Sequence, residues 1–345
     1  MNCPRVLLTG ANGFIGAHVL DVLLKNGAFV QAIVRGPEKA ARLRKDFSAF
    51  EKTRLDFSIV PDITVEGCFD KCMQECQPLD AVVHTAAPLA PTEFSKSLGP
   101  MLQGTLEILR SVSRHAPTVK RVVITGSFSS IGNVLDIQNG GIVYSSDSWN
   151  PITMEQAKFS HGEVAYWAGK TIAEKAAWEF VQNEKPPFEL VVLCPTAVYG
   201  PLRHSIDSIK DLNSSNNHLY ENFFASSKEL PVPEDYVQSS VDVRDLATAH
   251  YQACFAPSVG NRRYLVTAGE NLNQEISDIM REAFPDRDRN IPLGNPGNHT
   301  LGPEMFRTDN ALSKEVLGVS YRPFRETLVD VCRYFLEMEA QDSSA

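Results

Sequence analysis

Short apolar runs alternate with longer amphipathic stretches along most of this chain. A short apolar run bounded by turn residues is typical of a buried strand, and apolar positions three and four apart are typical of a helix. The runs that we predict as strands are residues 6–8, 29–34, 55–60, 80–85, 121–125, 190–194 and 263–267. Strands that alternate with helices form βαβ units with right-handed crossovers. The pattern therefore predicts an α/β fold with a doubly wound parallel sheet.

Three of the segments between these strands are distinctive. A helix of about 20 residues runs from 91 or so to 115 and leads into the fifth strand. A loop over 131–154 is too long for a simple connection, which favours a functional role. Residues 240–255 return to the core. We expect a helix to start near Asp242 and Asp245, because carboxylates are favoured at a helix N-terminus.

The sequence after the sixth run lacks a clean period, and we expect it to form a smaller substrate-binding lobe. Residues 203–230 are polar and rich in Ser and Asn, which favours a lid with one helix near 220–225. Further helices are predicted near residues 274–284, 310–317 and 323–338. We expect a nucleotide-binding domain over 1–195, completed by roughly 238–268, and a discontinuous lobe over 196–237 and 269–345.

Composition and charge exclude several classes of protein. With 345 residues, 43% of them hydrophobic and 22% charged, the chain can bury a full core. Its net charge of −9 without a basic run argues against nucleic-acid and anionic-membrane partners, since both need clustered Lys and Arg. No apolar stretch approaches the ~18 to 20 residues of a membrane span, and the first strand begins within about five residues, leaving no room for a signal peptide. We expect a cytoplasmic protein.

Seven cysteines are scattered along the chain. An odd number without a regular spacing does not resemble a disulfide framework. Cys68, Cys72 and Cys76 lie four apart and would share one face of a helix, but no His or further Cys is spaced to complete a tetrahedral metal site. We expect buried, reduced thiols and no metal.

The stretch TGANGFIG, residues 9–16, follows the first predicted strand and opens a helix over 14–24. Gly10 permits a tight bend, Gly13 lets backbone N–H groups approach a pyrophosphate, and Gly16 lets the helix pack closely on the strand. The phosphates would lie at the helix N-terminus, where unpaired N–H groups and the dipole favour an anion. The order of strand, glycine turn and helix favours a Rossmann-type dinucleotide site over a structural glycine turn in another α/β protein.

The residues after the second strand indicate which dinucleotide binds. In a dinucleotide fold an acid at this place, ~20 residues past the glycines, binds the ribose hydroxyls, whereas Arg receives a 2′-phosphate. This chain has Arg35, and Lys39 lies in the helix start that follows. Two cations at a helix N-terminus oppose the dipole unless an anion joins them. The pattern favours NADP over the alternative, a solvated basic helix start.

The ends of the third and fourth strands supply further candidate cofactor contacts. Asp62 and Ile63 follow the third strand and are placed to touch adenine. Thr85, Ala86 and Ala87 follow the fourth strand, where small side chains would let the backbone approach the cofactor. Ligands of such sheets bind at the carboxyl ends of the strands. The alternative for the three small residues is a plain strand-to-helix loop.

Ser127, Tyr166 and Lys170 are the candidate catalytic residues. Ser127 follows the fifth strand and would face the cofactor, where its hydroxyl can polarise a carbonyl oxygen. Tyr166 and Lys170 lie four apart on the next long helix, so both side chains share one face. A nearby ammonium makes a phenol a better acid at neutral pH. The Lys170 ammonium also has donors for the nicotinamide ribose.

These residues resemble the extended short-chain dehydrogenase/reductase family, which is marked by TGxxGxxG, a Ser after the fifth strand and YxxxK on the following helix. Within it, the chain is similar to fungal NADPH-dependent aldehyde and ketone reductases of the methylglyoxal reductase type, which neighbour plant dihydroflavonol reductases. The resemblance covers essentially the whole chain. The supporting stretches are VRGPEKAARL, IVPDIT, HTAAP, YWAGKTIAEKAAWEF, LCPTAVYGP and SSVDVRDLATAH.

The resemblance implies a role for each matching residue. Ser127, Tyr166 and Lys170 match the catalytic triad. The implied cofactor contacts are Gly10, Gly13, Phe14, Ile15, Gly16, Arg35, Lys39, Asp62, Ile63, Thr85, Ala86, Ala87, Tyr166, Lys170, Pro195 and Val198. Gly126, Gly169 and Glu107 depart from the family, since many relatives have Ser, Ser and Asn at these places. The triad is untouched, and whether a proton relay exists behind Lys170 stays open.

The substrate pocket is the least specified part of the site. The candidate lining residues each follow a strand whose end faces the cofactor: Phe94, Phe128, Ile131, Val198 and Tyr199. The alternative for each of them is a residue of the apolar core. Together these features predict an NADPH-dependent carbonyl reductase that reduces an aldehyde or ketone, with Tyr166 as general acid. The alternatives are a dihydroflavonol-reductase-like or nucleotide-sugar-modifying enzyme and a non-catalytic NADP sensor. The sequence leaves monomer and homodimer equally open.

Overall fold

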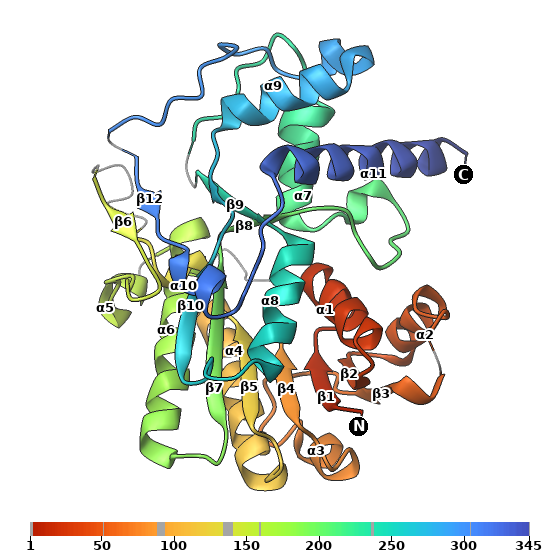
Figure 1. The fold of residues 1–345 in the computed structure, drawn as a ribbon, viewed down its shortest axis with the longest axis vertical. Helices are drawn as coiled ribbons and strands as arrows, with labels where there is room; N and C mark the ends of the chain where they lie inside the picture. Colours follow the sequence, from red (N-terminus) through yellow and green to blue (C-terminus); the bar gives the residue numbers. More distant parts are fainter. Residues whose placement is uncertain are drawn as a thin grey trace.

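The computed structural model of the chain describes residues 3–50, 52–87, 94–133, 141–158, 160–235, 238–303 and 305–344. A seven-stranded sheet forms its centre (Figure 1), with its strands in the order β10-β7-β5-β4-β1-β2-β3 and all neighbours parallel. Its strands are β1 (Arg5–Thr9), β2 (Phe29–Val34), β3 (Leu55–Ile59), β4 (Ala81–His84), β5 (Arg121–Thr125), β7 (Glu189–Pro195) and β10 (Arg262–Val266). The predicted α/β fold and its seven strands are confirmed, with each boundary within one residue.

Side chains on the two faces of the sheet enter two separate apolar cores, because successive residues of a strand point to opposite sides. Leu8 of β1 and Val191 of β7 belong to one core, whereas Leu7 and Val192 belong to the other. The first core is covered by α1 (Phe14–Lys25), α2 (Pro37–Asp46) and α8 (Val243–Phe255). The second is covered by α3 (Asp70–Glu75), α4 (Phe94–His115) and α6 (Gly162–Glu184).

A smaller lobe lies over the carboxyl edge of the sheet, in the upper half of Figure 1. Its three-stranded sheet has the order β11-β9-β8 and consists of β8 (Ala197–Tyr199), β9 (Ser239–Asp242) and β11 (Gly269–Glu270). Its helices are α7 (Ser214–Leu219), the π-helical η4 (Tyr220–Phe224), α9 (Asn273–Ala283) and α11 (Phe324–Ser344). They share a third apolar core that contains Phe223, Phe224 and Phe335. The sequence pattern did not predict this sheet, because strands of two to four residues show too little period.

Three predictions about the irregular segments need correction. The helix expected near 220–225 begins earlier, at Ser214, and continues into the π-helical turn. The expected loop over 131–154 contains β6 (Val143–Tyr144), which pairs with β12 (Arg307–Thr308), and its residues 134–140 lie outside the described part. Cys68 precedes α3 instead of sharing a helix face with Cys72.

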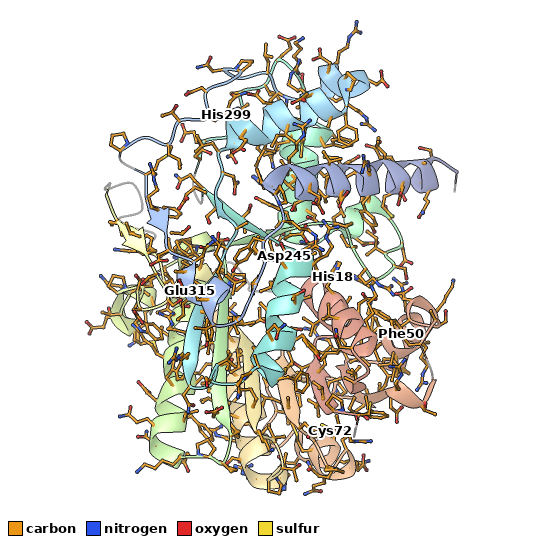
Figure 2. The ribbon with its side chains drawn as sticks, in the orientation of Figure 1. His18, Phe50, Cys72, Asp245, His299 and Glu315 are labelled. Carbon is orange, nitrogen blue, oxygen red and sulfur yellow. The ribbon has the colours of Figure 1, made fainter. Side chains whose placement is uncertain are left out.

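Five of the seven cysteines are buried, as expected, whereas Cys3 is exposed and Cys68 is half-buried. Cys72 and Cys76 are buried, and burial raises the pKa of the Cys72 thiol to about 12. Cys72 lies at the bottom of the molecule in Figure 2, remote from His299 at the top. Among the described residues, no group of three or more His, Cys, Asp or Glu side chains is arranged to hold a metal ion. Within the same residues, no helix combines the length and apolar composition that a membrane span needs.

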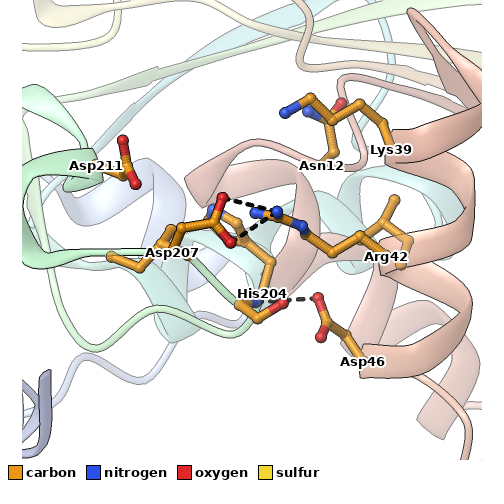
Figure 3. Close-up of a pocket in the computed structure, with 10 residues that line it drawn as sticks. Asn12, Lys39, Arg42, Asp46, His204, Asp207 and Asp211 are labelled. Carbon is orange, nitrogen blue, oxygen red and sulfur yellow. Dashed lines mark hydrogen bonds and ion pairs between the residues drawn. The ribbon is translucent and has the colours of Figure 1, made fainter. Parts of the chain in front are cut away.

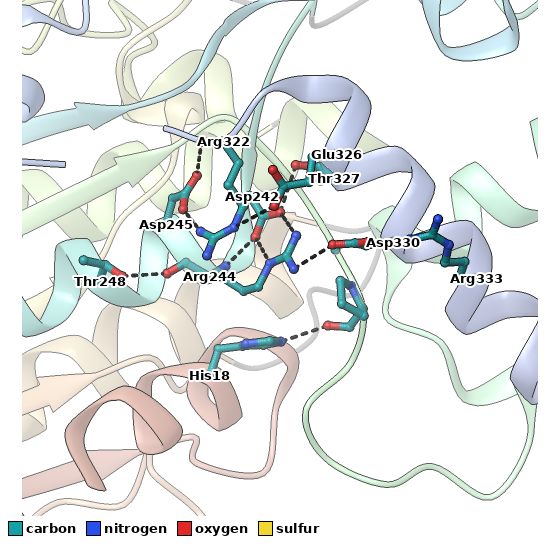
Figure 4. Close-up of polar contacts among 12 residues, drawn as sticks. His18, Asp242, Arg244, Asp245, Thr248, Arg322, Glu326, Thr327, Asp330 and Arg333 are labelled. Carbon is teal, nitrogen blue, oxygen red and sulfur yellow. Dashed lines mark hydrogen bonds and ion pairs between the residues drawn. The ribbon is translucent and has the colours of Figure 1, made fainter. Parts of the chain in front are cut away.

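A network of ion pairs joins α8 to α11 (Figure 4). Asp242 accepts a hydrogen bond from the Arg244 backbone N–H at 2.7 Å and so caps α8, as the sequence predicted for a carboxylate at this helix start. The Arg244 guanidinium bonds Asp242 at 2.7 Å and Asp330 of α11 at 2.8 Å, and Thr327 donates to Asp242 at 2.8 Å. Burial alone would raise the pKa of Asp242, but the bonds from Arg244 outweigh it and lower that pKa. The network therefore fixes the lobe above the sheet.

A buried ion pair fixes α6, the helix of Tyr166 and Lys170, to the sheet. Arg263 of β10 donates to Glu174 of α6 at 2.8 Å, and the two side chains are 8% and 4% exposed. The Arg263 guanidinium also lies 3.6 Å from the centroid of the Trp149 ring and donates to the Ser130 carbonyl at 3.2 Å. The charge on each side is thus compensated within the core.

Removing one partner of this pair should be costly, because it leaves an uncompensated buried charge. We expect Glu174→Ala to lower the free energy of unfolding by about 3 to 5 kcal/mol. The control is Glu179→Ala, an exposed position on the same helix, which should change it by less than about 0.5 kcal/mol. Urea denaturation followed by circular dichroism measures both. Equal effects at the two positions would contradict this account of how α6 is held.

Candidate active site

The glycine turn between β1 and α1 is tightly packed. Gly10 has φ +71°, and a Cβ there would lie 2.7 Å from the Ala86 nitrogen and from Thr85 Oγ1. A Cβ at Gly16 would lie 2.0 Å from the Gly10 carbonyl oxygen. Only glycine fits either position.

The start of α1 is free to bind an anion. Gly13 is the N-cap residue, with extended backbone, and as a glycine it offers no side chain to cap the helix. The first N–H groups of a helix have no partner within it, and the helix dipole favours negative charge there. The turn therefore presents a binding site for phosphate groups.

The end of β4 is hydrogen-bonded to this turn. Thr85 Oγ1 donates to the Thr9 carbonyl at 2.8 Å, and Thr9 Oγ1 pairs with His84 Nδ1 at 2.8 Å. The Ala86 N–H donates to Thr9 Oγ1 at 3.3 Å. The Thr85 hydroxyl thus joins the end of β4 to the glycine turn, a role that the small size of Thr85 did not predict. His84, which sequence reasoning missed, is buried, and its pKa falls to about 3 because of burial and the nearby Lys170 charge.

Lys170 meets the predicted cofactor contacts around a small cavity. The Nζ of Lys170 donates to the Thr125 carbonyl at 3.0 Å, which places the ammonium at the end of β5. The cavity has a volume of about 20 Å³, and its walls include Ile63, Ala86, Ala87 and Lys170. Residues predicted from two strand ends and from α6 therefore converge on the carboxyl edge of β4 and β5.

Ser127 follows β5 at the same edge. Ser127 Oγ donates to Ser129 Oγ at 2.9 Å and accepts from the Ser129 N–H at 3.1 Å. Tyr166 lies one helical turn before Lys170 on α6 and is 39% exposed. The Tyr166 hydroxyl makes no hydrogen bond within the described residues, so its proton is available to a ligand.

The predicted adenosine end lies at the ends of β2 and β3. Arg35 and Lys39 are both exposed, Arg35 just after β2 and Lys39 in the first turn of α2. Asp62 accepts hydrogen bonds from the Thr64 hydroxyl at 2.7 Å and the Thr64 N–H at 2.8 Å. These bonds, and to a smaller extent the Arg35 charge, lower the pKa of Asp62. Asp62 is thus an anion beside Arg35.

The structure assigns four of the predicted pocket residues to the apolar cores. Phe128 is 3% exposed and stacks on Phe306 at 5.3 Å between ring centroids, and Ile131 is fully buried. Phe306 arrives from a segment far along the chain, which no local pattern could reveal. Val198 and Tyr199 lie in β8 and are 9% and 8% exposed.

The structure also gives the positions of Pro195, Phe94 and Glu107, which the sequence analysis singled out. Pro195 ends β7 and pairs with Val266. Phe94 begins α4, and its side chain lies outside the described residues. Glu107, where many relatives have Asn, is fully buried and accepts hydrogen bonds from Gly67 and Arg110 at 2.9 and 2.7 Å. The Glu107 carboxylate is therefore engaged in holding α4.

Comparison with known proteins identifies the family of this chain. The model of the NAD dependent epimerase/dehydratase family matches residues 6–267. The chain belongs to this family. The resemblance to extended short-chain dehydrogenase/reductases, drawn from the motifs, is thereby confirmed.

Relatives within the family match along nearly their full length. A ketoreductase of Aspergillus niger is 35% identical over 340 residues, covering 96% of this chain and 98% of that protein. The NADPH-dependent methylglyoxal reductase of Saccharomyces cerevisiae is 34% identical over 347 residues, covering 97% and 99%. The crystal structure of yeast methylglyoxal/isovaleraldehyde reductase complexed with NADPH has a TM-score of 0.91 at 33% identity, covering 98% of this chain and 99% of that one.

The packing at Gly16 predicts a large effect of one methyl group. Gly16→Ala places a Cβ against the Gly10 carbonyl, and we expect it to lower the free energy of unfolding by about 3 kcal/mol. The control is Glu179→Ala, an exposed position on α6 that should change the free energy of unfolding by less than about 0.5 kcal/mol. Urea denaturation distinguishes the two. A stable Gly16→Ala protein would show that the turn can relax.

The buried His84 predicts a loss of stability in mild acid. Between its unfolded pKa of 6.5 and its folded pKa of about 3, the unfolded state binds more protons, so stability falls as the pH drops through this range. We expect this group to cost about 2 kcal/mol between pH 7 and pH 5. Urea denaturation of the wild type and of His84→Gln at pH 7 and pH 5 measures this loss. The variant should lose about 2 kcal/mol less free energy of unfolding than the wild type on acidification. An identical slope in both proteins would contradict a neutral, buried His84.

Proposed function

We propose that this chain is an NADPH-dependent carbonyl reductase that converts an aldehyde or ketone into an alcohol. The observation that carries the proposal is the position of the α6 face with Tyr166 and Lys170, which lies beside Ser127 at the carboxyl edge where the glycine turn opens. Ligands of doubly wound sheets bind at this edge. Relatives named as ketoreductase and methylglyoxal reductase, about one-third identical over their whole length, support the reaction class.

The residues present fit NADPH. The uncapped start of α1 and the absence of a Cβ at Gly10 and Gly16 suit a pyrophosphate. Arg35 and Lys39 would hold the 2′-phosphate, and the Lys170 ammonium has further donors for the nicotinamide ribose. When bound, NADPH supplies the hydride that reduces the carbonyl carbon. We assign substrate binding to residues 196–237 and 269–345, above this edge.

The chain's own residues would handle the proton. The Tyr166 hydroxyl donates its proton to the carbonyl oxygen, and the Lys170 ammonium one turn away stabilises the phenolate that remains. Ser127 would turn its hydroxyl from Ser129 Oγ to that oxygen and polarise it. The Thr125 carbonyl holds the Lys170 ammonium in place through this exchange.

Absorbance decay of NADPH and NADH with the purified protein tests the function. The panel comprises aliphatic aldehydes, methylglyoxal, aryl ketones, β-ketoesters and a dihydroflavonol. We expect turnover with NADPH well above that with NADH. NADPH binding without any oxidation across the panel would overturn the assignment to simple carbonyl reduction.

The role of Tyr166 gives a separate prediction. Positioned acid catalysis contributes ~10² to 10⁴ in rate, so Tyr166→Phe should lower kcat by that factor and leave NADPH affinity within about two-fold. The control is Tyr251→Phe on α8, whose ring packs against Phe255 and which should keep full activity. Steady-state kinetics and fluorescence titration measure the two quantities. An unchanged kcat in Tyr166→Phe would remove Tyr166 from the mechanism.

A further inference from the structure

A cavity on the nucleotide side of the molecule lies between α2 and a distant segment (Figure 3). It has a volume of about 230 Å³. One wall is a single face of α2 with Lys39, Arg42 and Asp46, and Asn12 of the glycine turn borders it. The cavity is therefore continuous with the turn that we assign to the dinucleotide.

The opposite wall is residues 203–211, which we call the strap. Arg203 donates to Asp21 of α1 at 2.7 Å, and its guanidinium lies 4.2 Å from the centroid of the Phe47 ring. The Ser205 N–H donates to Asp46 at 3.0 Å. These contacts hold the start of the strap on the nucleotide-binding face of the molecule.

A carboxylate of the strap, that of Asp207, forms an ion pair with Arg42. Both oxygens of Asp207 accept hydrogen bonds from Arg42 Nη2 at 2.8 Å. The two side chains are 38% and 75% exposed, and an exposed ion pair of this kind contributes little to stability. Asp207 can therefore leave Arg42 when a better anion arrives.

The groups around Arg42 indicate which anion that is. Lys39 precedes Arg42 by one turn on the same face of α2, and both side chains line the cavity. A guanidinium binds a phosphate as it binds a carboxylate, but a phosphate brings about two negative charges and three acceptor oxygens. His204 Nδ1, also at this cavity, is buried without a partner among the described residues.

We propose that Arg42 is a third cation for the 2′-phosphate of NADPH, and that Asp207 of the strap occupies it until the phosphate binds. This inference rests on the proposed NADPH function. It makes Arg42 a specificity-determining residue and Asp207 an internal competitor of the phosphate. Affinity for 2′-phosphorylated ligands then depends on how easily Asp207 leaves.

Binding of adenosine fragments tests the proposal without catalysis. The probes are 2′,5′-ADP and 5′-ADP, titrated by calorimetry into the full chain. We expect Arg42→Gln to weaken 2′,5′-ADP about ten-fold and to leave 5′-ADP unchanged. We expect Asp207→Asn to strengthen 2′,5′-ADP about three- to five-fold, since the competitor has lost its charge. In the double variant the Asp207→Asn gain should vanish, because it acts through Arg42.

Arg44→Gln is the matched control. Arg44 lies on the same helix, pairs with exposed Asp56 at 3.4 Å and does not line the cavity, so this variant should bind both probes as wild type does. Equal weakening of both probes by Arg42→Gln would show a purely structural role and overturn the proposal. Weaker 2′,5′-ADP binding in Asp207→Asn would overturn the competition.

Failure of the proposed function gives a different result. If the wild-type chain binds 5′-ADP as well as 2′,5′-ADP, the NADPH assignment itself fails. If wild type prefers 2′,5′-ADP and Arg42→Gln keeps that preference, only the role of Arg42 fails.

Discussion

The close approach of α1 to the end of β1 is the constraint on which the rest of the site depends. A Cβ at Gly16 would lie 2.0 Å from the Gly10 carbonyl, so the helix reaches this position only because the side chain is absent. The approach brings the uncapped helix start to the carboxyl edge of the sheet. There the bonds of Thr9 to His84 and Thr85 join the turn to β4. Phosphate binding and the placement of β4 thus follow from one packing contact.

The second half of the site depends on how α6 is held. Tyr166 and Lys170 share a helix face through local spacing alone, but their distance from the sheet does not follow from that spacing. Arg263 and Glu174 set it through a buried ion pair whose two charges compensate each other. Removing either charge would leave the other unpaired in an apolar core. Tyr166, Lys170 and the structural Glu174 thus lie on successive turns of one helix.

The ion pair of Arg42 and Asp207 at the nucleotide end has a different character, because it is exposed. The Arg244 network between α8 and α11 is partly buried and fixes the lobe, whereas Arg42 and Asp207 meet in solvent. Buried pairs serve positioning, and exposed pairs can yield to a ligand.

Local sequence was sufficient for most features that depend on short-range periodicity or spacing, although it failed at Cys68, which precedes α3, and at the helix that begins at Ser214. The seven strands, the glycine turn, the cap at Asp242 and the shared face of Tyr166 and Lys170 all involve residues within a few positions of each other. Backbone geometry makes such neighbours meet in any context.

Only the tertiary structure decided the features that join distant segments. Phe128 became a core residue because Phe306 packs on it, and Arg42 met Asp207 across 165 positions. The short strands β8, β9 and β11 likewise form only as partners of one another. The reason is physical: the burial of Phe128 and the ion pair of Arg42 depend on which segments the chain brings together, and no local period encodes that.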